Sequence, residues 1–529
     1  MSPILEIDNL SVALPRGADR ALALEGVSLA LEAGEILCVV GESGSGKSMT
    51  ANATMRLLPV GVGVAGGAIR FEGRDLLRLP EAEMRQLRGS RIAMVFQEPM
   101  TALNPLRSIG DQIGEAFRTH TALGRAEIER RVLGHLEEVR LPDPRTAARA
   151  YPHELSGGQR QRAMIAMALA LEPTVLIADE PTTALDVTTQ AQILHLIREL
   201  QRKKGTAVLF ITHDFGVVGE IADRVTVMQS GRVVESGSVA DVLDRPQHAY
   251  TRMLLAAVPP LTAAPARAVS AEVALSIDRV SKTFVTRGSG LRRRSTRALH
   301  EVTLSLPKGA TLGVVGESGS GKSTLAKCLV RLLAPDTGAI RLADVDLAQL
   351  SRREARRATA RIQMVFQDPY GSLNPRRRAG ELVAQGPIAH GVARPEALAR
   401  AKALFALVGL DPAATDRYPH EFSGGQRQRI GLARALALEP EILVADEPVS
   451  SLDVSVQAQV LKLLAELRAR LGLSMVFITH DLRVAAQICD RVAVMKDGSV
   501  VEQGLASEVF GAPRHPYTQA LIEAIPRRR

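Results

Sequence analysis

Short apolar runs alternate with charged, helix-like segments along the chain, and this alternation occurs twice. The run "EILCVV" in the first half and "ATLGVV" in the second each lead into a glycine-rich loop, and "TVLIAD" and "AVLFIT" follow in the first half. Such runs are typical of strands that are buried on both faces. The pattern therefore predicts an α/β fold in each half, with a mostly parallel sheet and helices on both faces.

The stretch between Gln97 and Ser156 departs from this alternation. It becomes helical and charged, as in "RAEIERRVLGHLEEVRL". We therefore expect an inserted helical subdomain in the first half, with a counterpart in the second.

The two halves repeat each other over nearly their whole length. The loop "GESGSGKSMT" at Gly41 returns as "GESGSGKSTL" at Gly316, and the strand that ends at His213 returns at His480, 267 residues later. A period this long indicates a duplicated domain rather than a solenoid of short repeats.

The boundary between the halves is marked by composition. The segment "AVPPLTAAPARAVSAEVAL" is rich in Ala and Pro, which is typical of a short extended linker. We therefore expect a first domain over residues 1–258, a linker over 259–272 and a second domain over 273–529.

Composition and charge narrow the function classes. The content of 46% hydrophobic and 23% charged residues is that of a folded soluble protein, and no stretch approaches the about 20 apolar residues of a membrane-spanning helix. The N-terminus also lacks the basic start and apolar run of a signal peptide, so we expect a cytoplasmic chain. The net charge of +9 would suit a nucleic acid or an anionic membrane. Basic residues cluster only in "LRRRSTR" and the final "RRR", however, so a solvated surface is favoured.

The three cysteines Cys38, Cys328 and Cys489 lie far apart in the sequence. They form no CxxC pair of the kind that binds a metal or forms a redox couple. We expect them to be reduced, packed thiols.

Both glycine loops satisfy the pattern GxxxxGK[ST] between a strand and a helix, the context in which this pattern holds phosphates. Backbone N–H groups and the helix N-terminus would hold the phosphates, and Lys47 and Lys322 would reach the β- and γ-phosphates. The hydroxyls of Ser48 and Ser323 would bind Mg²⁺. The candidate nucleotide-binding residues are Gly41, Glu42, Ser43, Gly44, Ser45, Gly46, Lys47, Ser48 and Met49, and Gly316, Glu317, Ser318, Gly319, Ser320, Gly321, Lys322, Ser323 and Thr324.

Two later strands, "LIADE" and "LVADE", end in adjacent carboxylates. Asp179 and Asp446 can hold Mg²⁺ at the strand end, because carboxylate oxygens are hard ligands. Glu180 and Glu447 can point at the γ-phosphate and polarise an attacking water. The sequence thus predicts a metal ligand and a catalytic carboxylate side by side in each half.

A glutamine follows each "MVF" strand, and a histidine ends each "FIT" strand. Gln97 and Gln367 can contact both the metal ion and the attacking water. His213 and His480 can hydrogen-bond the γ-phosphate. We expect these four residues to complete the two catalytic sites.

The stretches "LSGGQRQR" and "FSGGQRQR" form a second anion cradle in each half. Small residues at a helix N-terminus let backbone N–H groups approach a phosphate. The residues concerned are Ser156, Gly157, Gly158 and Gln159, and Ser423, Gly424, Gly425 and Gln426. These motifs lie in the helical insert, far in sequence from their own lysine loop, and need not serve the same nucleotide.

Taken together, these motifs resemble the ATP-binding cassette (ABC) family across essentially the whole chain. The resemblance implies two tandem P-loop NTPase domains of ABC type. Each would have a mostly parallel core sheet, an antiparallel β subdomain and an inserted helical subdomain, and would use ATP and Mg²⁺. It also implies head-to-tail pairing, with each ATP between the lysine loop (Walker A) of one half and the SGGQ signature of the other.

The residues of each composite site follow from the resemblance. One site would combine Lys47, Ser48, Gln97, Asp179, Glu180 and His213 with Ser423 and Gly425, and the other would combine Lys322, Ser323, Gln367, Asp446, Glu447 and His480 with Ser156 and Gly158. Asp186 in "TALD" and Asp453 in "SSLD" match the family's D-loop, which crosses this interface.

A closer resemblance is carried by "FQEPMTALNP" and "FQDPYGSLNP" and by the tails "QHAYTRMLLAAVP" and "RHPYTQALIEAIP". They are similar to the oligopeptide, dipeptide and nickel importer subgroup, and the fused arrangement resembles the ATPase of peptide and microcin-C-type importers. This implies ATP hydrolysis that drives solute import, with peripheral binding at the cytoplasmic face of the bacterial inner membrane. Two permease subunits and an extracytoplasmic solute-binding protein are implied as partners, and no nucleic acid. Peptide is the default solute, and nickel, glutathione-like, opine-like and microcin-like solutes stay open.

The chain departs from the family pattern in two places. The family places an aromatic residue under the adenine ring, and Phe284 fits this role in the second half, whereas the aligned residue in the first half is Leu14. We therefore expect unequal ATP sites. Some relatives bind an iron–sulfur cluster through cysteines in the C-terminal extension. These tails contain no cysteine, so we expect neither an iron–sulfur cluster nor zinc.

Two other classes of twin-cassette protein are alternatives. Soluble factors that act on ribosomes typically separate their cassettes by a long charged helical arm, whereas the linker here is short and rich in Ala and Pro. DNA-damage sensors require zinc-type cysteine clusters, which this sequence lacks. A transport ATPase is the favoured function, with the ribosomal factor as the alternative.

Overall fold

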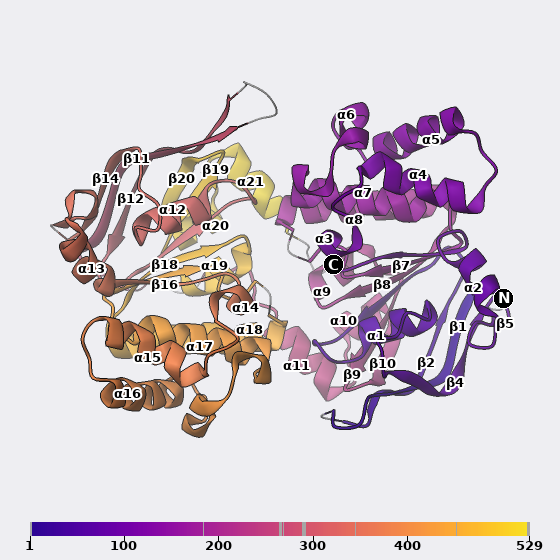
Figure 1. The fold of residues 1–529 in the computed structure, drawn as a ribbon, viewed down its shortest axis with the longest axis horizontal. Helices are drawn as coiled ribbons and strands as arrows, with labels where there is room; N and C mark the ends of the chain where they lie inside the picture. Colours follow the sequence, from indigo (N-terminus) through magenta and orange to yellow (C-terminus); the bar gives the residue numbers. More distant parts are fainter. Residues whose placement is uncertain are drawn as a thin grey trace. The chain divides into compact units, whose positions relative to one another are not determined.

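The computed structural model describes residues 3–18, 20–183, 185–263, 267, 269–287, 293–343, 345–450 and 452–525. These residues form two compact units (Figure 1). The first unit contains residues up to 185 and 189–258, and the second contains 186–188 and 259–525. The expected linker over residues 259–272 falls in the second unit and partly outside the described residues. Our division into domains stays a prediction.

A six-stranded core sheet organises the first unit, in the order β10-β9-β3-β8-β7-β6. Its strands are β3 (Ile36–Val40), β6 (Ile92–Val95), β7 (Val175–Asp179), β8 (Ala207–Thr212), β9 (Arg224–Gln229) and β10 (Arg232–Ser238). Within this sheet, β6, β7, β8, β3 and β9 each run parallel to the next strand, and β10 pairs antiparallel with β9. Every residue of β3, β7 and β8 is buried. The apolar runs therefore form central strands covered on both faces, as predicted.

An antiparallel sheet forms the second layer of the first unit, in the order β2-β1-β4-β5. Its strands are β1 (Leu5–Ala13), β2 (Leu22–Leu31), β4 (Gly63–Phe71) and β5 (Arg74–Asp75). One hydrophobic cluster joins Leu5, Val27 and Ile69 of this sheet to Leu37 and Ile177 of the core sheet. The other face of the core sheet packs against helices in a second cluster.

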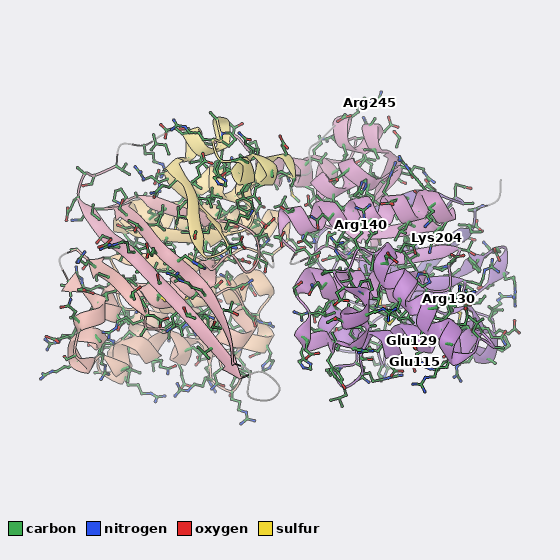
Figure 2. All side chains as sticks on the ribbon, turned by 90° about the horizontal axis from the view of Figure 1, so that it is seen from above. Glu115, Glu129, Arg130, Arg140, Lys204 and Arg245 are labelled. Carbon is green, nitrogen blue, oxygen red and sulfur yellow. The ribbon has the colours of Figure 1, made fainter. Side chains whose placement is uncertain are left out.

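The helices of the first unit include the predicted helical insert, which extends from α3 to α7 between β6 and β7. The helices are α1 (Lys47–Thr54), α2 (Glu81–Leu87), α3 (Pro99–Ala102), α4 (Ile109–His120), α5 (Arg125–Glu138), α6 (Pro144–Arg149), η1 (Pro152–Glu154), α7 (Gly157–Leu169), α8 (Val187–Lys204), α9 (Phe215–Ile221), α10 (Val239–Asp244) and α11 (Ala249–Ala257). Many exposed charges in this part of the chain are ion-paired, among them Glu115 in α4, Arg130 in α5 and Arg140 in the turn after α5, all labelled in Figure 2.

The second unit has the same architecture. Its core sheet has the order β16-β17-β18-β13-β19-β20 and its antiparallel sheet the order β12-β11-β14-β15. The strands are β11 (Val273–Arg287), β12 (Arg293–Pro307), β13 (Thr311–Val315), β14 (Thr337–Leu342), β15 (Val345–Asp346), β16 (Ile362–Val365), β17 (Ile442–Asp446), β18 (Ser474–Thr479), β19 (Arg491–Lys496) and β20 (Ser499–Leu505).

Helices of the second unit follow the same order as in the first. They are α12 (Lys322–Leu329), η2 (Leu347–Gln349), α13 (Arg352–Arg361), α14 (Pro369–Ser372), α15 (Ala379–Ala389), α16 (Arg394–Leu407), η3 (Pro412–Asp416), η4 (Pro419–Glu421), α17 (Gly424–Leu436), α18 (Val454–Leu471), α19 (Leu482–Ile488), α20 (Ala506–Gly511) and α21 (Pro516–Glu523). The insert from α14 to α17 lies between β16 and β17. The predicted α/β fold, with its antiparallel and helical subdomains, is thus confirmed in both units.

Three further sequence expectations bear on the structure. Cys38, Cys328 and Cys489 are buried and unbridged, and burial raises the pKa of each thiol, so the expectation of packed thiols is confirmed. Among the described residues, no helix has the length and apolar character needed to cross a membrane. The side chains of the basic clusters at 292–294 and 527–529 lie outside the described residues.

Candidate functional site

The glycine loop of each unit connects a central strand to a helix, as the motif predicts. In the first unit, β3 leads through Gly41–Gly46 into α1, and Gly41 has a positive φ of 154°. A Cβ atom at Gly41 would lie 2.2 Å from the backbone oxygen of Met228. Gly316 repeats both features, with a φ of 150° and the Met495 oxygen at 2.2 Å. Only glycine fits at these positions, because the loop turns directly against β9 or β19.

The loop lysine is buried in each unit and bonds the carbonyls at the start of its own loop. Lys47 Nζ donates to the oxygens of Gly41 at 2.7 Å and Glu42 at 2.9 Å. Lys322 Nζ donates to the equivalent oxygens of Gly316 at 2.8 Å and Glu317 at 2.7 Å. Burial lowers the pKa of Lys322. The ammonium groups are therefore held at the mouth of each loop, where a phosphate would meet them.

The predicted metal ligands meet at the end of β7 and β17. Ser48 Oγ donates to Asp179 Oδ1 at 2.9 Å, and Ser323 Oγ donates to Asp446 Oδ1 at 3.2 Å. Burial, with the charge of the adjacent glutamate adding to it, raises the pKa of both aspartates to about 6. A hydroxyl and a carboxylate oxygen, together with phosphate oxygens, are the donor set that Mg²⁺ prefers, so the residues fit this ion. This donor set contains a single carboxylate in each unit. A different kind of metal site, made of three or more His, Cys, Asp or Glu side chains, does not occur within the described residues.

Glu180 accepts hydrogen bonds from the other predicted catalytic residues of the first unit. Its Oε2 atom lies 3.0 Å from Gln97 Nε2 and 3.3 Å from His213 Nδ1. Glu447 Oε2 lies 2.9 Å from Gln367 Nε2 and 3.2 Å from His480 Nδ1. Both units thus bring the glutamate, the glutamine and the histidine together.

The environment of these glutamates keeps them ionised. Burial works against ionisation of Glu180, but the hydrogen bond and charge of His213 and the charge of Lys47 outweigh it and lower its pKa to about 2. The pKa of Glu447 is also lowered, because His480 outweighs the effect of burial. Each carboxylate is therefore available as a hydrogen-bond acceptor for a water molecule at neutral pH.

The signature residues stand at the start of α7 and α17, away from the lysine loop of the same unit. Ser156 Oγ accepts from Gln159 N at 3.3 Å, and Gln159 Oε1 accepts from Ser156 N at 2.9 Å, which is a capping box. Ser423 and Gln426 form the same capping box in the second unit. The serine thus organises the helix N-terminus that was predicted to cradle an anion.

Gly158 and Gly425 have a packing role that the sequence analysis did not foresee. A Cβ atom at Gly158 would lie 2.6 Å from Thr189 Cγ2, and one at Gly425 would lie 2.4 Å from Val456 Cγ1. Glycine at these positions therefore lets α7 approach α8, and α17 approach α18. The adjacent Gly157 has open space around it.

The predicted adenine-contacting position differs between the units. Phe284 in β11 is 38% exposed, so its ring is accessible. Leu14, which follows β1, is partly buried and packs against the core of the first unit. The structure thus leaves an aromatic face available in the second unit, where the first unit has a packed aliphatic side chain.

Two contacts at the site were missed by the sequence analysis. Thr183 Oγ1 donates to Glu180 Oε2 at 2.9 Å, and Ser450 Oγ donates to Glu447 O at 3.2 Å. The signal was a hydroxyl residue three positions after each glutamate. In addition, Arg20 Nη2 donates to Gly44 O at 2.7 Å and braces the first glycine loop, for which no sequence signal was available.

Comparisons with known proteins agree with the motifs. The chain matches the ABC transporter family over residues 24–183 and 299–450. It also matches the oligopeptide/dipeptide transporter C-terminal region over residues 234–287 and 501–529. Both matches occur once in each half, so the whole cassette with its C-terminal region is duplicated.

Curated relatives match along nearly the whole chain. The peptidoglycan transport ATP-binding protein YejF of Agrobacterium fabrum is 49% identical over 528 residues, which cover 99% of this chain and 96% of the relative. The glutathione import ATP-binding protein GsiA of Escherichia coli strain K12 is 45% identical over 562 residues, which cover 99% of this chain and 89% of the relative. A solved dimeric structure of the ATP-binding cassette MJ0796, bound to ADP and Pi, is 30% identical, with a TM-score of 0.40 over 44% of this chain and 98% of the other.

These matches confirm the family resemblance and support transport rather than the ribosomal alternative. Members of this family bind ATP and hydrolyse it, and import ATPases among them work with membrane permeases. The family model matches both halves, the two glycine loops have the same geometry, and the relatives align over 99% of this chain. The chain belongs to the ABC transporter family and is an ATP-hydrolysing subunit with two cassettes.

Proposed function

We propose that this chain drives the import of peptides or related small solutes across a bacterial cytoplasmic membrane. The observation that carries the proposal is the oligopeptide/dipeptide transporter C-terminal region, which follows the cassette in both halves. The relatives act in peptidoglycan transport and glutathione import, which are tasks with peptide-like solutes. Peptide, glutathione-like and microcin-like solutes fit this reading best, and nickel and opine-like solutes stay as further candidates.

We propose the following roles for the site residues of the first cassette, which their geometry supports. The backbone N–H groups of the glycine loop and Lys47 bind the phosphates of ATP. Ser48, Asp179 and Gln97 would hold Mg²⁺, which would supply charge neutralisation at the phosphates. In the second cassette, Lys322, Ser323, Asp446 and Gln367 have the same roles. The raised pKa of the aspartates agrees with this role, since a buried carboxylate is stabilised by a cation.

The catalytic step depends on Glu180 and Glu447. Each carboxylate has a lowered pKa and accepts a hydrogen bond from a glutamine. It can therefore orient a water molecule and polarise it for attack on the γ-phosphate. His213 and His480 contact the same carboxylates, and in this proposal they hydrogen-bond the γ-phosphate.

The signature motifs complete the proposal. We propose that Ser156 and Ser423 each act on the nucleotide held by the other cassette, as the family resemblance implies. Double-variant cycles test this assignment, because a change at Ser423 should be coupled to a change at Lys47 rather than to one at Lys322. Coupling of Ser423 to Lys322 instead would contradict the assignment. The D-loop roles of Asp186 and Asp453 stay predictions of the same resemblance.

The partners follow from the transport function. In this proposal the chain binds two permease subunits at the cytoplasmic face of the membrane. An extracytoplasmic solute-binding protein would deliver the solute to these permeases. The proposal includes no nucleic acid as a partner.

Affinity purification tests the proposed function. The tagged Glu180→Gln, Glu447→Gln double variant is purified with ATP and Mg²⁺ from detergent-solubilised cells of the source organism, and partners are identified by mass spectrometry. The matched control is the Lys47→Ala, Lys322→Ala double variant, which should not be held in an ATP-bound state. We expect two integral membrane permeases with the glutamate variant. Ribosomal proteins without permeases would overturn the proposal.

A further inference from the structure

A tyrosine from the C-terminal region reaches the glycine loop of the first cassette. Tyr250, in α11, is 6% exposed, and its hydroxyl oxygen accepts a hydrogen bond from Glu42 N at 3.2 Å. The same hydroxyl donates to Glu42 Oε2 at 3.0 Å. Glu42 is the second residue of the phosphate-binding loop. The two contacts therefore join a segment that follows the core sheet to the entrance of the loop, 208 residues earlier.

The second cassette repeats this contact. The hydroxyl of Tyr517, in α21, accepts from Glu317 N at 3.2 Å. Lys496 Nζ lies 4.9 Å from the centre of the Tyr517 ring, within reach of a cation–π interaction. Burial raises the pKa of the Tyr517 hydroxyl, so it stays protonated and can donate as well as accept. The same contact in both cassettes argues against a chance encounter of side chains.

A clamp of hydrogen bonds fixes the tyrosine in the first cassette. Glu235, in β10, accepts from the backbone N–H groups of Gln247 at 2.7 Å and His248 at 3.2 Å. His248 Nδ1 then caps α11 by accepting from Tyr250 N at 3.2 Å. The edge strand of the core sheet therefore sets the start of α11, and α11 sets the position of the Tyr250 hydroxyl.

The clamp is also repeated in the second cassette. Glu502, in β20, accepts from the N–H groups of Arg514 at 2.8 Å and His515 at 3.1 Å. His515 Nδ1 accepts from Tyr517 N at 3.1 Å. Both tyrosines lie within the matched C-terminal region, at 234–287 and 501–529.

The loop residue that the tyrosine holds is also the one that holds the lysine. Glu42 donates its N–H to Tyr250, and its carbonyl accepts from Lys47 Nζ. Glu317 connects Tyr517 and Lys322 in the same way. A shift of Glu42 or Glu317 would move the carbonyl oxygen that orients the lysine ammonium group. It would also disturb the N–H groups that follow in the glycine loop.

We infer that Tyr250 and Tyr517 are positioning residues for ATP binding, which set the entrance of the glycine loop from the C-terminal region of each cassette. They act on the nucleotide through Glu42 and Glu317 and do not touch the reacting atoms. The inference requires ATP binding by the cassettes and is independent of the proposed import function, so its failure would leave that function untouched.

ATP titration of the purified full-length chain tests the inference. Tyr250→Phe removes the hydroxyl and keeps the ring, and it is measured in a Lys322→Ala background so that the first cassette dominates binding. Loss of one or two hydrogen bonds predicts an ATP affinity lower by about three- to tenfold, with a KM that rises by more than kcat falls. Tyr517→Phe in a Lys47→Ala background should give the same result for the second cassette.

Tyr151→Phe is the matched control, because this tyrosine is 42% exposed and its ring stacks on His153 in the helical insert. It should leave ATP affinity unchanged. The His248 clamp supplies a second test, since His248→Ala should lower ATP affinity and His248→Asn, which keeps a capping acceptor, should restore it. Unchanged affinity and KM in both tyrosine variants would overturn the inference. A lower Tm with unchanged affinity would also overturn it, because the tyrosines would then be structural only.

Discussion

The two cassettes are nearly identical at the site and different on their outer helices. Lys47 and Lys322 lie 2.7 and 2.8 Å from the first carbonyl of their loops, and the Gln–Glu contacts are 3.0 and 2.9 Å long. The backbone of each loop is confined by glycines pressed against a neighbouring strand, which leaves little room for divergence. Outside the glycine loops the two cassettes differ from each other in sequence. These differences show which features the site requires.

One difference lies at the C-terminal ends of α5 and α8 in the first cassette. His135, stacked on Phe117, lies 3.4 Å from Glu138, and Glu138 bonds Lys203 at 2.9 Å and Lys204 at 3.1 Å. His135, Glu138, Lys203 and Lys204 line a cavity of about 980 Å³. Lys204 is labelled in Figure 2.

The second cassette has leucines at the corresponding positions of α16 and α18. Leu404 and Leu407, which replace His135 and Glu138, are partly buried and pack against the hydrophobic core. Leu471 replaces Lys204. The end of the first helix is therefore held by apolar packing of Leu404 and Leu407 in the second cassette and by a network of charges in the first, whereas Leu471 is 45% exposed.

A second difference is a buried ion pair in the second cassette. Arg468 lies 3.0 Å from Asp490, both side chains are less than a tenth exposed, and Arg468 also donates to Thr311 at 2.8 Å. The first cassette has Gln201 at this position, which donates to the Gly34 carbonyl. In the first cassette Asp223, which aligns with Asp490, pairs instead with Arg198 at 3.2 Å, and both of these side chains are more exposed. Both cassettes therefore have a charge pair, and the pair is more deeply buried in the second.

The largest effect is expected at the features that the cassettes share. Glu180→Gln and Glu447→Gln each remove the carboxylate that orients water, and we expect each to lower ATP turnover at its own site by about a hundredfold or more. The measurement is phosphate release by the purified chain, with ATP binding checked in parallel. Wild-type turnover in either variant would show that its glutamate is not required for hydrolysis and that the two cassettes are not equivalent.

The buried ion pair should give the largest difference in stability. Arg468→Ala leaves the buried Asp490 with only its longer contact to Arg267, at 3.7 Å, and should lower the free energy of unfolding of the second cassette by up to about 3–5 kcal/mol. Gln201→Ala in the first cassette should cost about 1 kcal/mol. Scanning calorimetry of both variants compares these losses. Equal and small shifts of the melting transitions would show that the ion pair has no special role.

Nucleotide affinity should differ through the base-stacking position. Phe284→Leu should weaken ATP binding to the second cassette by about 0.5–1.5 kcal/mol, and Leu14→Phe should strengthen binding to the first by a similar amount. ATP titration in the lysine-variant backgrounds measures each cassette separately. Equal ATP affinities in the wild type and both variants would show that the residue at this position does not make the two cassettes differ in ATP binding.

The smallest effect concerns pH. Burial and the nearby charge of Lys204 lower the pKa of His135 below its unfolded value, although Glu138 opposes this. The unfolded chain then binds more protons, so this histidine destabilises the fold as the pH falls through about 6.5. His135→Leu, which copies Leu404, should reduce the loss of stability between pH 7 and pH 5.5 in denaturation experiments. An identical pH profile in the variant would exclude His135 as a contributor.

The sequence predicted those parts of the site that depend on local order. The glycine loops, the strand-end Asp–Glu pairs and the capping serines lie at the joins of strands and helices, where a few adjacent residues determine the geometry. The contacts of Arg20 with Gly44 and of Tyr250 with Glu42 could not be predicted, because they join residues that only the packing of separate elements brings together. The packing role of Gly158 was missed for the same reason, since it depends on Thr189 in another helix.

The number of nucleotides bound per chain tests the central claim most directly. The Glu180→Gln, Glu447→Gln double variant is titrated with ATP and Mg²⁺ to saturation, with the concentration of folded chain measured independently. Two matched cassettes predict one nucleotide for each cassette in every chain. Saturation at half that value would contradict the account, because one of the two glycine loops would then not bind ATP.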